Sequence, residues 1–217
     1  MNKNKSVYCS GPLFCPEEIG GMTAIANVFE KAGYSTFLPH RDGVEPYVLP
    51  MVNSPLNINI LNIRALIDRA IFALDVYQLI DCCDYFVFNM NGRVPDEGGV
   101  AETAIAYAAG KPIVLYKNDN RTAFNGKDNS MVTGLSYGPI ISDIRKLPSE
   151  MERIAIKLNK KGPSPYQGNN IPPEMQKTLR FGKKVHGILR RLPDKTDKSS
   201  SALIDAITKI CEEDRGE

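Results

Sequence analysis

The residues best suited to chemistry lie in one glycine-rich stretch, residues 89–112, with the sequence NMNGRVPDEGGVAETAIAYAAGKP. It places Asp96 just after an apolar run and Glu102 in the opening turns of a predicted alanine-rich helix. Unpaired N–H groups and the helix dipole favour negative charge at a helix start. We therefore expect Glu102 to stay ionised, as a nucleophile that attacks an anomeric carbon must. The alternative is a solvated or capping glutamate.

Three further residues extend this candidate site. Gly98 and Gly99 let the backbone pass close to a ligand, because glycine has no side chain. Asp75 lies late in an apolar helical segment with few polar neighbours. Burial there would raise the pKa of its carboxyl, which suits a general acid. An exposed position on an amphipathic helix is the alternative for Asp75, and a local turn role is the alternative for Asp96.

These residues need a scaffold, and the chain alternates between strand-like and helix-like patterns. Such alternation is typical of a parallel α/β sheet, in which ligands collect beyond the carboxyl ends of the strands. We predict a doubly wound, flavodoxin- or Rossmann-like sheet of five parallel strands. The expected strands are residues 5–9, 35–38, 85–90, 113–116 and 138–142.

Helices are predicted between and after the strands, and the chain is expected to have two parts. An α/β domain over residues 1–160 is followed by a linker and helical extension over 161–217. A loop rich in Pro and Asn is expected over residues 39–57, where it would border the active site. Ser149 and Glu152 have capping-box spacing. The expected helices are residues 16–32, 59–81, 98–109, one starting at Ser149, 173–191 and 199–213.

Several short motifs resemble those of the nucleoside 2-deoxyribosyltransferase family, in the family's order and over roughly residues 5–145. Each piece alone is weak, and the combination carries the resemblance. The matching pieces are YCSGPLF (8–14), Asp75, PDEGGVAE (95–102), GKP (110–112) and DNSM (128–131).

The resemblance implies a reaction and roles for four residues. In that family the glutamate matching Glu102 is the nucleophile that takes the deoxyribosyl group, and the tyrosine matching Tyr8 holds that glutamate in place. The aspartates matching Asp75 and Asp96 serve base protonation and substrate hydrogen bonding. The physics agrees, because loss of a nucleobase creates an oxocarbenium-like sugar that a carboxylate can trap, as in retaining glycosidases.

The resemblance also implies how the substrate is bound. The asparagine matching Asn129 reaches the 5'-hydroxyl side of the sugar, often across a subunit boundary, and Gly11 and Phe14 would shape the site and stack on the nucleoside. We therefore expect 2'-deoxynucleosides and free purine or pyrimidine bases as partners, and a homo-oligomer with its active site at a subunit interface. Small family members place their C-terminal carboxylate in the site, whereas more than fifty residues follow the last predicted strand here.

Three rival functions stay open. The first is an N-glycosidase of the same superfamily, which passes the sugar of a deoxynucleoside or its 5'-monophosphate to water. Relatives acting on monophosphates tend to have a serine-bearing loop where Asp96 stands, so we favour the free nucleoside. The second is a cytokinin-activating phosphoribohydrolase, whose Gly-Gly-x-Gly-Thr run differs from the residues at 98–102. The third is a non-enzymatic nucleotide-binding module.

Composition narrows the possible partners. The net charge is only +2, but residues 157–198 hold eleven Lys and Arg against three acidic residues. The rest of the chain is therefore acidic, and nucleic-acid binding by the main body is not expected. The basic segment is either a solvated helix face or a surface for phosphate or nucleic acid.

Metal and membrane signals are missing from the sequence. Five cysteines and two histidines show neither CxxC spacing nor a second ligand type beside a histidine. We therefore predict no metal site, no disulfide framework and no cofactor. No apolar stretch approaches the roughly 20 residues that cross a bilayer, and the N-terminal residues do not resemble a signal peptide. We expect a cytoplasmic protein.

Overall fold

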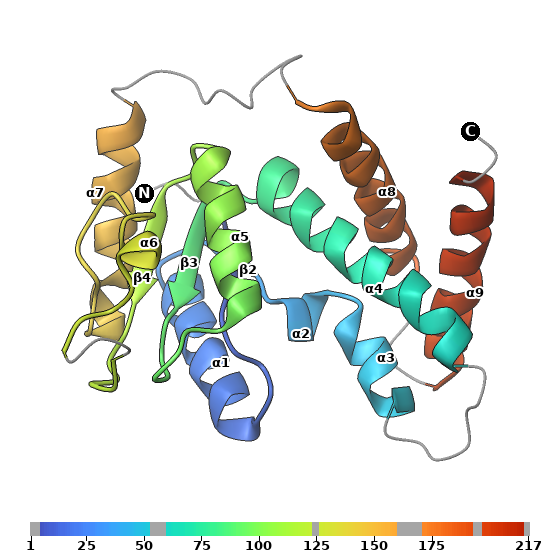
Figure 1. Cartoon of the computed structure of the whole chain (residues 1–217), viewed down its shortest axis with the longest axis horizontal. Helices are drawn as coiled ribbons and strands as arrows, with labels where there is room; N and C mark the ends of the chain where they lie inside the picture. The colour runs from blue at the N-terminus through green and yellow to red at the C-terminus, as the bar shows by residue number, and fades with distance from the viewer. Residues whose placement is uncertain (1–4, 53–59, 123–125, 160–170, 193–196, 215–217) are drawn as a thin grey trace. The chain divides into compact units, whose positions relative to one another are not determined.

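The computed structural model describes residues 5–52, 60–122, 126–159, 171–192 and 197–214 (Figure 1). Contacts divide the chain into two compact units. The first combines Met1–Leu38 with Leu79–Ile171, and the second combines Pro39–Gln78 with Pro172–Glu217. The C-terminal helices therefore share a unit with a segment from the first half of the chain, and the division proposed at residue 160 stays a prediction.

The first unit contains a parallel sheet of four strands in the order β2-β1-β3-β4. The strands are β1 (Ser6–Ser10), β2 (Ser35–Phe37), β3 (Tyr85–Asn89) and β4 (Ile113–Tyr116), close to their predicted positions. Because β1 pairs with both β2 and β3, the direction of strand succession reverses between β1 and β3. Open α/β sheets bind ligands at the carboxyl ends of the strands beside such a reversal.

The predicted fifth strand, residues 138–142, is wrong. Only Ile141 pairs there, in one parallel bridge to Tyr116. Pro139 has no backbone N–H to donate to a neighbouring strand. Asp143 then accepts a hydrogen bond from the backbone N–H of Arg145 and starts the short helix η2 (Ile144–Lys146). A proline before Ile141 and a helix cap after it leave too few residues for a strand.

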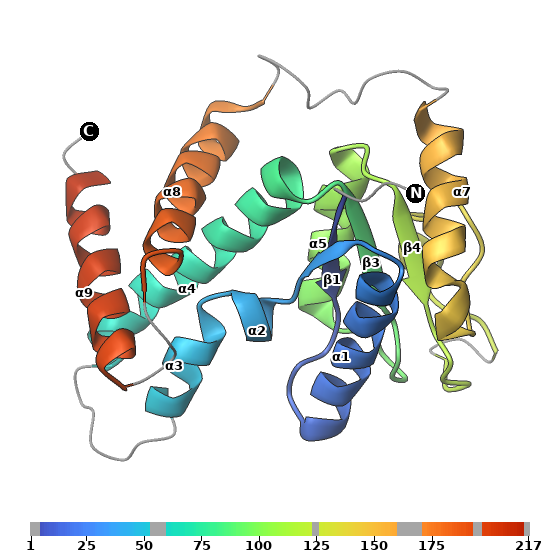
Figure 2. The ribbon, with the colours of Figure 1, turned by 180° about the vertical axis from the view of Figure 1, so that it is seen from behind.

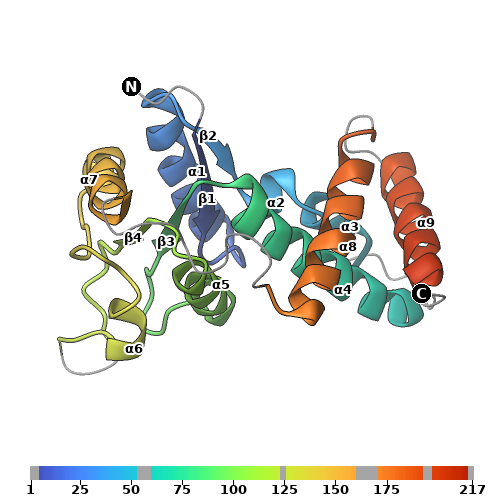
Figure 3. The same cartoon turned by 90° about the horizontal axis from the view of Figure 1, so that it is seen from above.

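Helices cover both faces of this sheet (Figure 3). Helices α1 (Pro16–Lys31) and α7 (Leu147–Asn159) lie on one face, and α5 (Glu97–Ala108) lies on the other. Side chains alternate along a strand, so Val7 and Cys9 of β1 belong to the core beneath α1 and α7. Tyr8 and Ser10 consequently point to the α5 face.

The second unit is helical (Figure 2). It contains α2 (Pro39–Asp42), α3 (Glu45–Val52), α4 (Ile60–Tyr77), α8 (Pro173–Leu189) and α9 (Asp197–Asp214). Helix α4 packs along α8 and α9, and the π-helical turn η1 (Gln78–Cys82) leads from α4 back to the sheet. Within the described residues, none of the helices is long and apolar enough to span a membrane.

The loop predicted over residues 39–57 is wrong where the structure describes it. Pro39 opens α2 and Pro46 is the second residue of α3. A proline is well tolerated in the first turn of a helix, because its missing N–H would have no partner within the helix there. These prolines therefore mark helix starts, and residues 53–57 lie outside the described residues.

Candidate active site

The carboxylate of Glu102 lies in the second turn of α5 and accepts hydrogen bonds from two hydroxyl groups of β1. The Tyr8 hydroxyl donates to Glu102 Oε1 at 2.6 Å, and the Ser10 hydroxyl donates to Glu102 Oε2 at 2.5 Å. Each oxygen of the carboxylate thus has a donor of its own. Glu102 is half-buried and lies against β1, one of the two strands between which the strand order reverses.

Packing within the sheet holds both hydroxyl groups in place independently of Glu102. The Tyr8 ring is fully buried and stacks on Phe86, with ring centroids 5.6 Å apart and an interplanar angle of 11°. It also contacts Phe37 at a centroid distance of 5.4 Å. Ser10 is buried at the end of β1, two residues after Tyr8 and on the same face of the strand. The strand therefore presents two ordered donors to one carboxylate.

A negative charge on Glu102 would be stabilised by these donors more than by the helix start. The effect of a helix dipole falls off within the first turn, and Glu102 comes after it. Hydrogen bonds that reach the charged form of a carboxyl favour ionisation. An ionised Glu102 stays a prediction, and the hydroxyls of β1 support it more directly than the helix terminus does.

Asp96 occupies the start of α5 itself. It is the N-cap residue, and its Oδ2 accepts a hydrogen bond from the backbone N–H of Gly99 at 2.6 Å. Burial raises the pKa of the Asp96 carboxyl, against the opposing effect of that hydrogen bond. Neighbouring Glu97 and Glu18 raise the pKa further. The first-turn N–H of Gly99 is therefore already engaged by a carboxyl of the protein.

The two glycines of the motif have different surroundings. Gly99 is buried, and a Cβ added there would lie 2.2 Å from the Phe88 ring of β3. Its absence lets α5 approach the sheet closely enough for Glu102 to reach β1. Gly98 is exposed, and a Cβ added there would lie 3.3 Å from its nearest neighbour, Asp96 Oδ2. Close packing accounts for Gly99, while Gly98 leaves the solvent side of the helix start open.

Three other predicted residues lie outside this hydrogen-bonded group. Gly11 is buried directly after β1, whereas the Phe14 side chain, just before α1, is 82% exposed. Asn129 is exposed and is the N-cap of the short helix α6 (Ser130–Thr133), where its Oδ1 accepts from the N–H of Met131 at 2.9 Å. The Met131 side chain is 79% exposed. Apolar surface at Phe14 and Met131 is thus open on the first unit.

Asp75 belongs to the second unit. It lies in the last turns of α4, where Ala73, Leu74 and Val76 are buried. The Asp75 side chain is half-buried, and its Oδ1 is buried. Three of its neighbours along the helix are thus buried, while Phe72 is exposed, and the role of Asp75 as a general acid stays a prediction.

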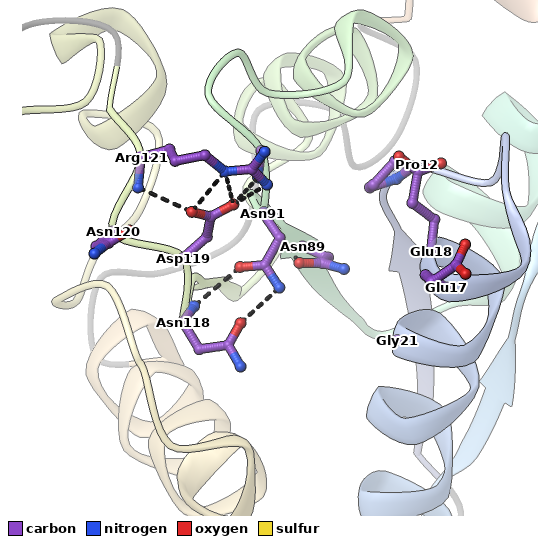
Figure 4. Close-up of a pocket in the computed structure, with 11 residues that line it drawn as sticks. Pro12, Glu17, Glu18, Gly21, Asn89, Asn91, Asn118, Asp119, Asn120 and Arg121 are labelled. Atoms are coloured by element: carbon purple, nitrogen blue, oxygen red, sulfur yellow. Dashed lines mark hydrogen bonds and ion pairs between the residues drawn. The ribbon is translucent and has the colours of Figure 1, made fainter.

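A separate polar pocket of about 640 Å³ lies on the α1 face of the sheet (Figure 4). Asn89, one of its lining residues, donates from Nδ2 to Met22 Sδ at 3.6 Å, which places this side chain on the face opposite Glu102. Hydrogen bonds from Arg121 lower the pKa of Asp119, and Asn91 donates to Asn118 at 2.7 Å. The lining residues are Pro12, Glu17, Glu18, Gly21, Asn89, Asn91, Gly92, Asn118, Asp119, Asn120 and Arg121.

Comparison with known proteins places the chain in a family. A sequence model described as nucleoside 2-deoxyribosyltransferase matches residues 7–151. The chain belongs to this family. No curated protein matches it. Among solved structures, a conserved protein from Enterococcus faecalis V583 is similar, with a TM-score of 0.46 and 20% identity. The similarity covers 69% of this chain and 98% of that chain.

For this member of the nucleoside 2-deoxyribosyltransferase family, our sequence analysis gave Ser10 no role of its own within the YCSGPLF motif. A signal was available, since Ser10 follows Tyr8 by two residues and strand side chains alternate. The sequence analysis also missed the polar pocket. Asn91 follows β3 and Asn118 follows β4, where ligands of parallel sheets collect, but residue spacing did not predict that the two would meet.

Proposed function

We propose that this chain transfers the 2-deoxyribosyl group between nucleobases through a covalent ester on Glu102. The observation that carries the proposal is the Glu102 carboxylate itself, ordered by the hydroxyls of Tyr8 and Ser10 beside the strand reversal. Membership of the family, whose model spans this group of residues, supports the same reaction. The two hydroxyl donors of β1 favour a nucleophilic Glu102 over a solvated helix residue.

The reaction has two balanced steps. A Glu102 oxygen forms a bond to C1' of the deoxynucleoside while the C1'–N bond breaks, and the departing base keeps that electron pair and accepts a proton from a carboxyl group. A nitrogen of the second base then attacks C1', the ester bond to Glu102 breaks, and the incoming base returns a proton. We assign the proton transfers to Asp75, because its Oδ1 is buried among apolar neighbours on α4.

The start of α5 favours a free nucleoside over a 5'-monophosphate. A helix N-terminus is a ready site for phosphate, because its N–H groups lack partners within the helix. Here the Asp96 carboxyl already accepts from the N–H of Gly99 and would repel a phosphate placed there. We therefore assign Asp96 to hydrogen bonding of the sugar or base.

Transfer also requires that water be kept from the ester until the second base arrives. We propose that a second copy of the chain helps, with Asn129 reaching the sugar across the subunit boundary. The exposed Phe14 and Met131 side chains supply apolar surface for such a contact. Sedimentation velocity that shows only single chains would remove this part of the proposal.

The test is base exchange from deoxyinosine, with and without adenine. We expect deoxyadenosine to form, little free deoxyribose, and weak use of deoxyinosine 5'-monophosphate. Glu102→Gln should lower the rate by about 10⁴-fold or more, as when other enzymes lose their nucleophile. Glu97→Gln is the matched control, because Glu97 is an exposed glutamate on the same helix, and its rate should stay near that of the unaltered chain.

Mass spectrometry of the protein mixed with deoxyinosine alone should show an adduct of one deoxyribosyl group on Glu102, absent in Glu102→Gln. Sugar release that does not depend on adenine would make the chain an N-glycosidase instead. Full activity of Glu102→Gln would overturn the covalent mechanism, and binding without turnover by the unaltered chain would leave only a nucleoside-binding module.

A further inference from the structure

The second donor to Glu102, Ser10, takes no part in the bond-making and bond-breaking steps of the proposed reaction. Ser10 is 1% exposed, and its hydroxyl lies 2.5 Å from Glu102 Oε2, while Tyr8 donates to Oε1. A carboxylate held by one donor can still rotate about its Cγ–Cδ bond. With a donor on each oxygen, both from the same strand, the plane of the carboxylate is set by β1.

We propose that Ser10 is a second positioning residue for the nucleophile, which fixes the plane of the Glu102 carboxylate and stabilises its charge through Oε2. This inference rests on the proposed function. Ser10 touches neither base nor sugar in this role and acts only through Glu102. A hydrogen bond between a hydroxyl and a carboxylate is charge-assisted and roughly twice as strong as a neutral one.

The role predicts an unequal effect on the two steps of transfer. Glu102 is charged before the ester forms and neutral while the ester lasts. A hydroxyl that stabilises the carboxylate therefore stabilises the product of ester breakdown, and it makes Glu102 the better leaving group. Loss of the hydroxyl slows breakdown more than formation, so more of the enzyme is present as the ester during turnover.

Three variants separate this role from general damage to the strand. Ser10→Ala removes the donor, and Ser10→Cys keeps a weak donor of similar size at the same place. Ser6→Ala is the matched control, because Ser6 lies on the same strand and its hydroxyl donates instead to the Cys82 carbonyl at 2.9 Å. Thermal unfolding of all three checks that they fold.

For Ser10→Ala we expect kcat to fall about 10-fold, which is the loss of one charge-assisted hydrogen bond. The acidic limb of its pH–rate profile should move up by about one pH unit, because the charged form of Glu102 has lost a donor. The fraction of enzyme trapped as the ester should be higher in Ser10→Ala than in the unaltered chain. Ser10→Cys should lie between these two proteins, and Ser6→Ala should match the unaltered chain. An unmoved acidic limb and an unchanged ester fraction in a folded Ser10→Ala protein would overturn the inference.

A measurement without substrate keeps this inference distinct from the proposed function. In protein labelled with ¹³C at glutamate carboxyls, the Glu102 signal is assigned by its loss in Glu102→Gln. Its titration midpoint should rise in Ser10→Ala and not in Ser6→Ala, whether or not the chain transfers deoxyribose. An unchanged midpoint rejects the Ser10 contact, whereas a shifted midpoint in a chain without base exchange rejects the proposed function alone.

Discussion

Different kinds of interaction stabilise the interior of each of the two units. In the first unit, polar groups near the sheet have specific partners. Tyr8 and Ser10 hold Glu102, and Lys117 at the end of β4 pairs with Asp128 at 2.5 Å, with side chains only 4% and 10% exposed. A buried polar group without its partner is costly, so each of these pairs depends on accurate placement by the sheet.

In the second unit, helix packing dominates the described contacts. Phe181 and Val185 of α8 are buried against the other helices, and the Arg69 guanidinium of α4 lies over the Phe181 ring at 4.4 Å from its centroid. A polar pair also occurs here, between Gln78 and His186 at 2.8 Å. The contrast indicates that the first unit spends stability on ordered polar groups, as sites of chemistry do, while the second relies on close approach of helices.

The largest effect is expected at the buried ion pair of the first unit. Lys117→Met leaves the Asp128 carboxylate buried without its counter-charge, which costs about 3–5 kcal/mol in such sites. Asp128 directly precedes Asn129, so base exchange should fall with the loss of order in this segment. Denaturant unfolding and base exchange measure the two effects. Lys127→Met is the matched control, because Lys127 is exposed.

The double variant Lys117→Met/Asp128→Leu sharpens this test. Replacing both partners by apolar groups removes the uncompensated charge, so most of the lost stability should return. If the single variant unfolds at the same denaturant concentration as the unaltered chain, the pair does not hold this segment and the contrast between the units weakens.

In the second unit, adding a single methyl group to α8 should disrupt its packing against α4. A Cβ at Gly182 of α8 would lie 2.0 Å from the Ala73 carbonyl oxygen and 2.7 Å from Tyr77 Cβ, both on α4. The backbone carbonyl cannot turn aside, so Gly182→Ala must push the helices apart, at a cost of about 1–3 kcal/mol. Denaturant unfolding should show a lower midpoint.

Gly187 on the same helix provides the matched control. A Cβ there would have nothing within 4 Å, so Gly187→Ala should stabilise the chain by about 0.5–1 kcal/mol through helix propensity. Equal effects of the two substitutions would contradict close packing of α8 on α4.

Hydrophobic patterns predicted most of this fold. The apolar run at β3 and the helical periodicity of α8 lie within two residues of their predicted bounds. The patterns failed where one residue type has two meanings. Pro39 and Pro46 suggested a loop but lie in the first turns of helices. Pro139 lies in the predicted fifth strand, where only Ile141 pairs with a neighbouring strand. Local composition does not distinguish these roles of proline, because tertiary contacts decide among them.

The site was predictable only in part. Residue spacing alone left two interpretations of Glu102 open, a nucleophile and an ordinary helix residue, and the resemblance to a family supplied Tyr8 as its partner. Tyr8 and Glu102 are 94 positions apart, and the pairing of β1 with β3 and the packing of α5 on both strands bring them together. Ser10 follows once Tyr8 is known, by alternation along the strand. Long-range contacts of this kind depend on strand order, which periodicity does not contain.

The smallest effect concerns the polar pair of the second unit, at His186. The Gln78 amide donates to His186 Nδ1, which requires an unprotonated Nδ1. Burial lowers the pKa of His186, and nearby Arg190 lowers it further. The unfolded chain, with a histidine pKa of about 6.5, therefore binds more protons than the folded chain below that pH. Stability should be full above about pH 6.5 and should fall as the pH drops toward the folded pKa.

Thermal unfolding at pH 7.5 and pH 5.5 checks this prediction. The unaltered chain should lose more stability between the two pH values than His186→Gln, in which the titrating ring is gone and an uncharged side chain takes its place. His40 is present in both proteins, so its contribution cancels in the difference. A larger loss in His186→Gln would mean that protonated His186 stabilises α8 against α4, and the second unit would then share the charge dependence ascribed here to the first.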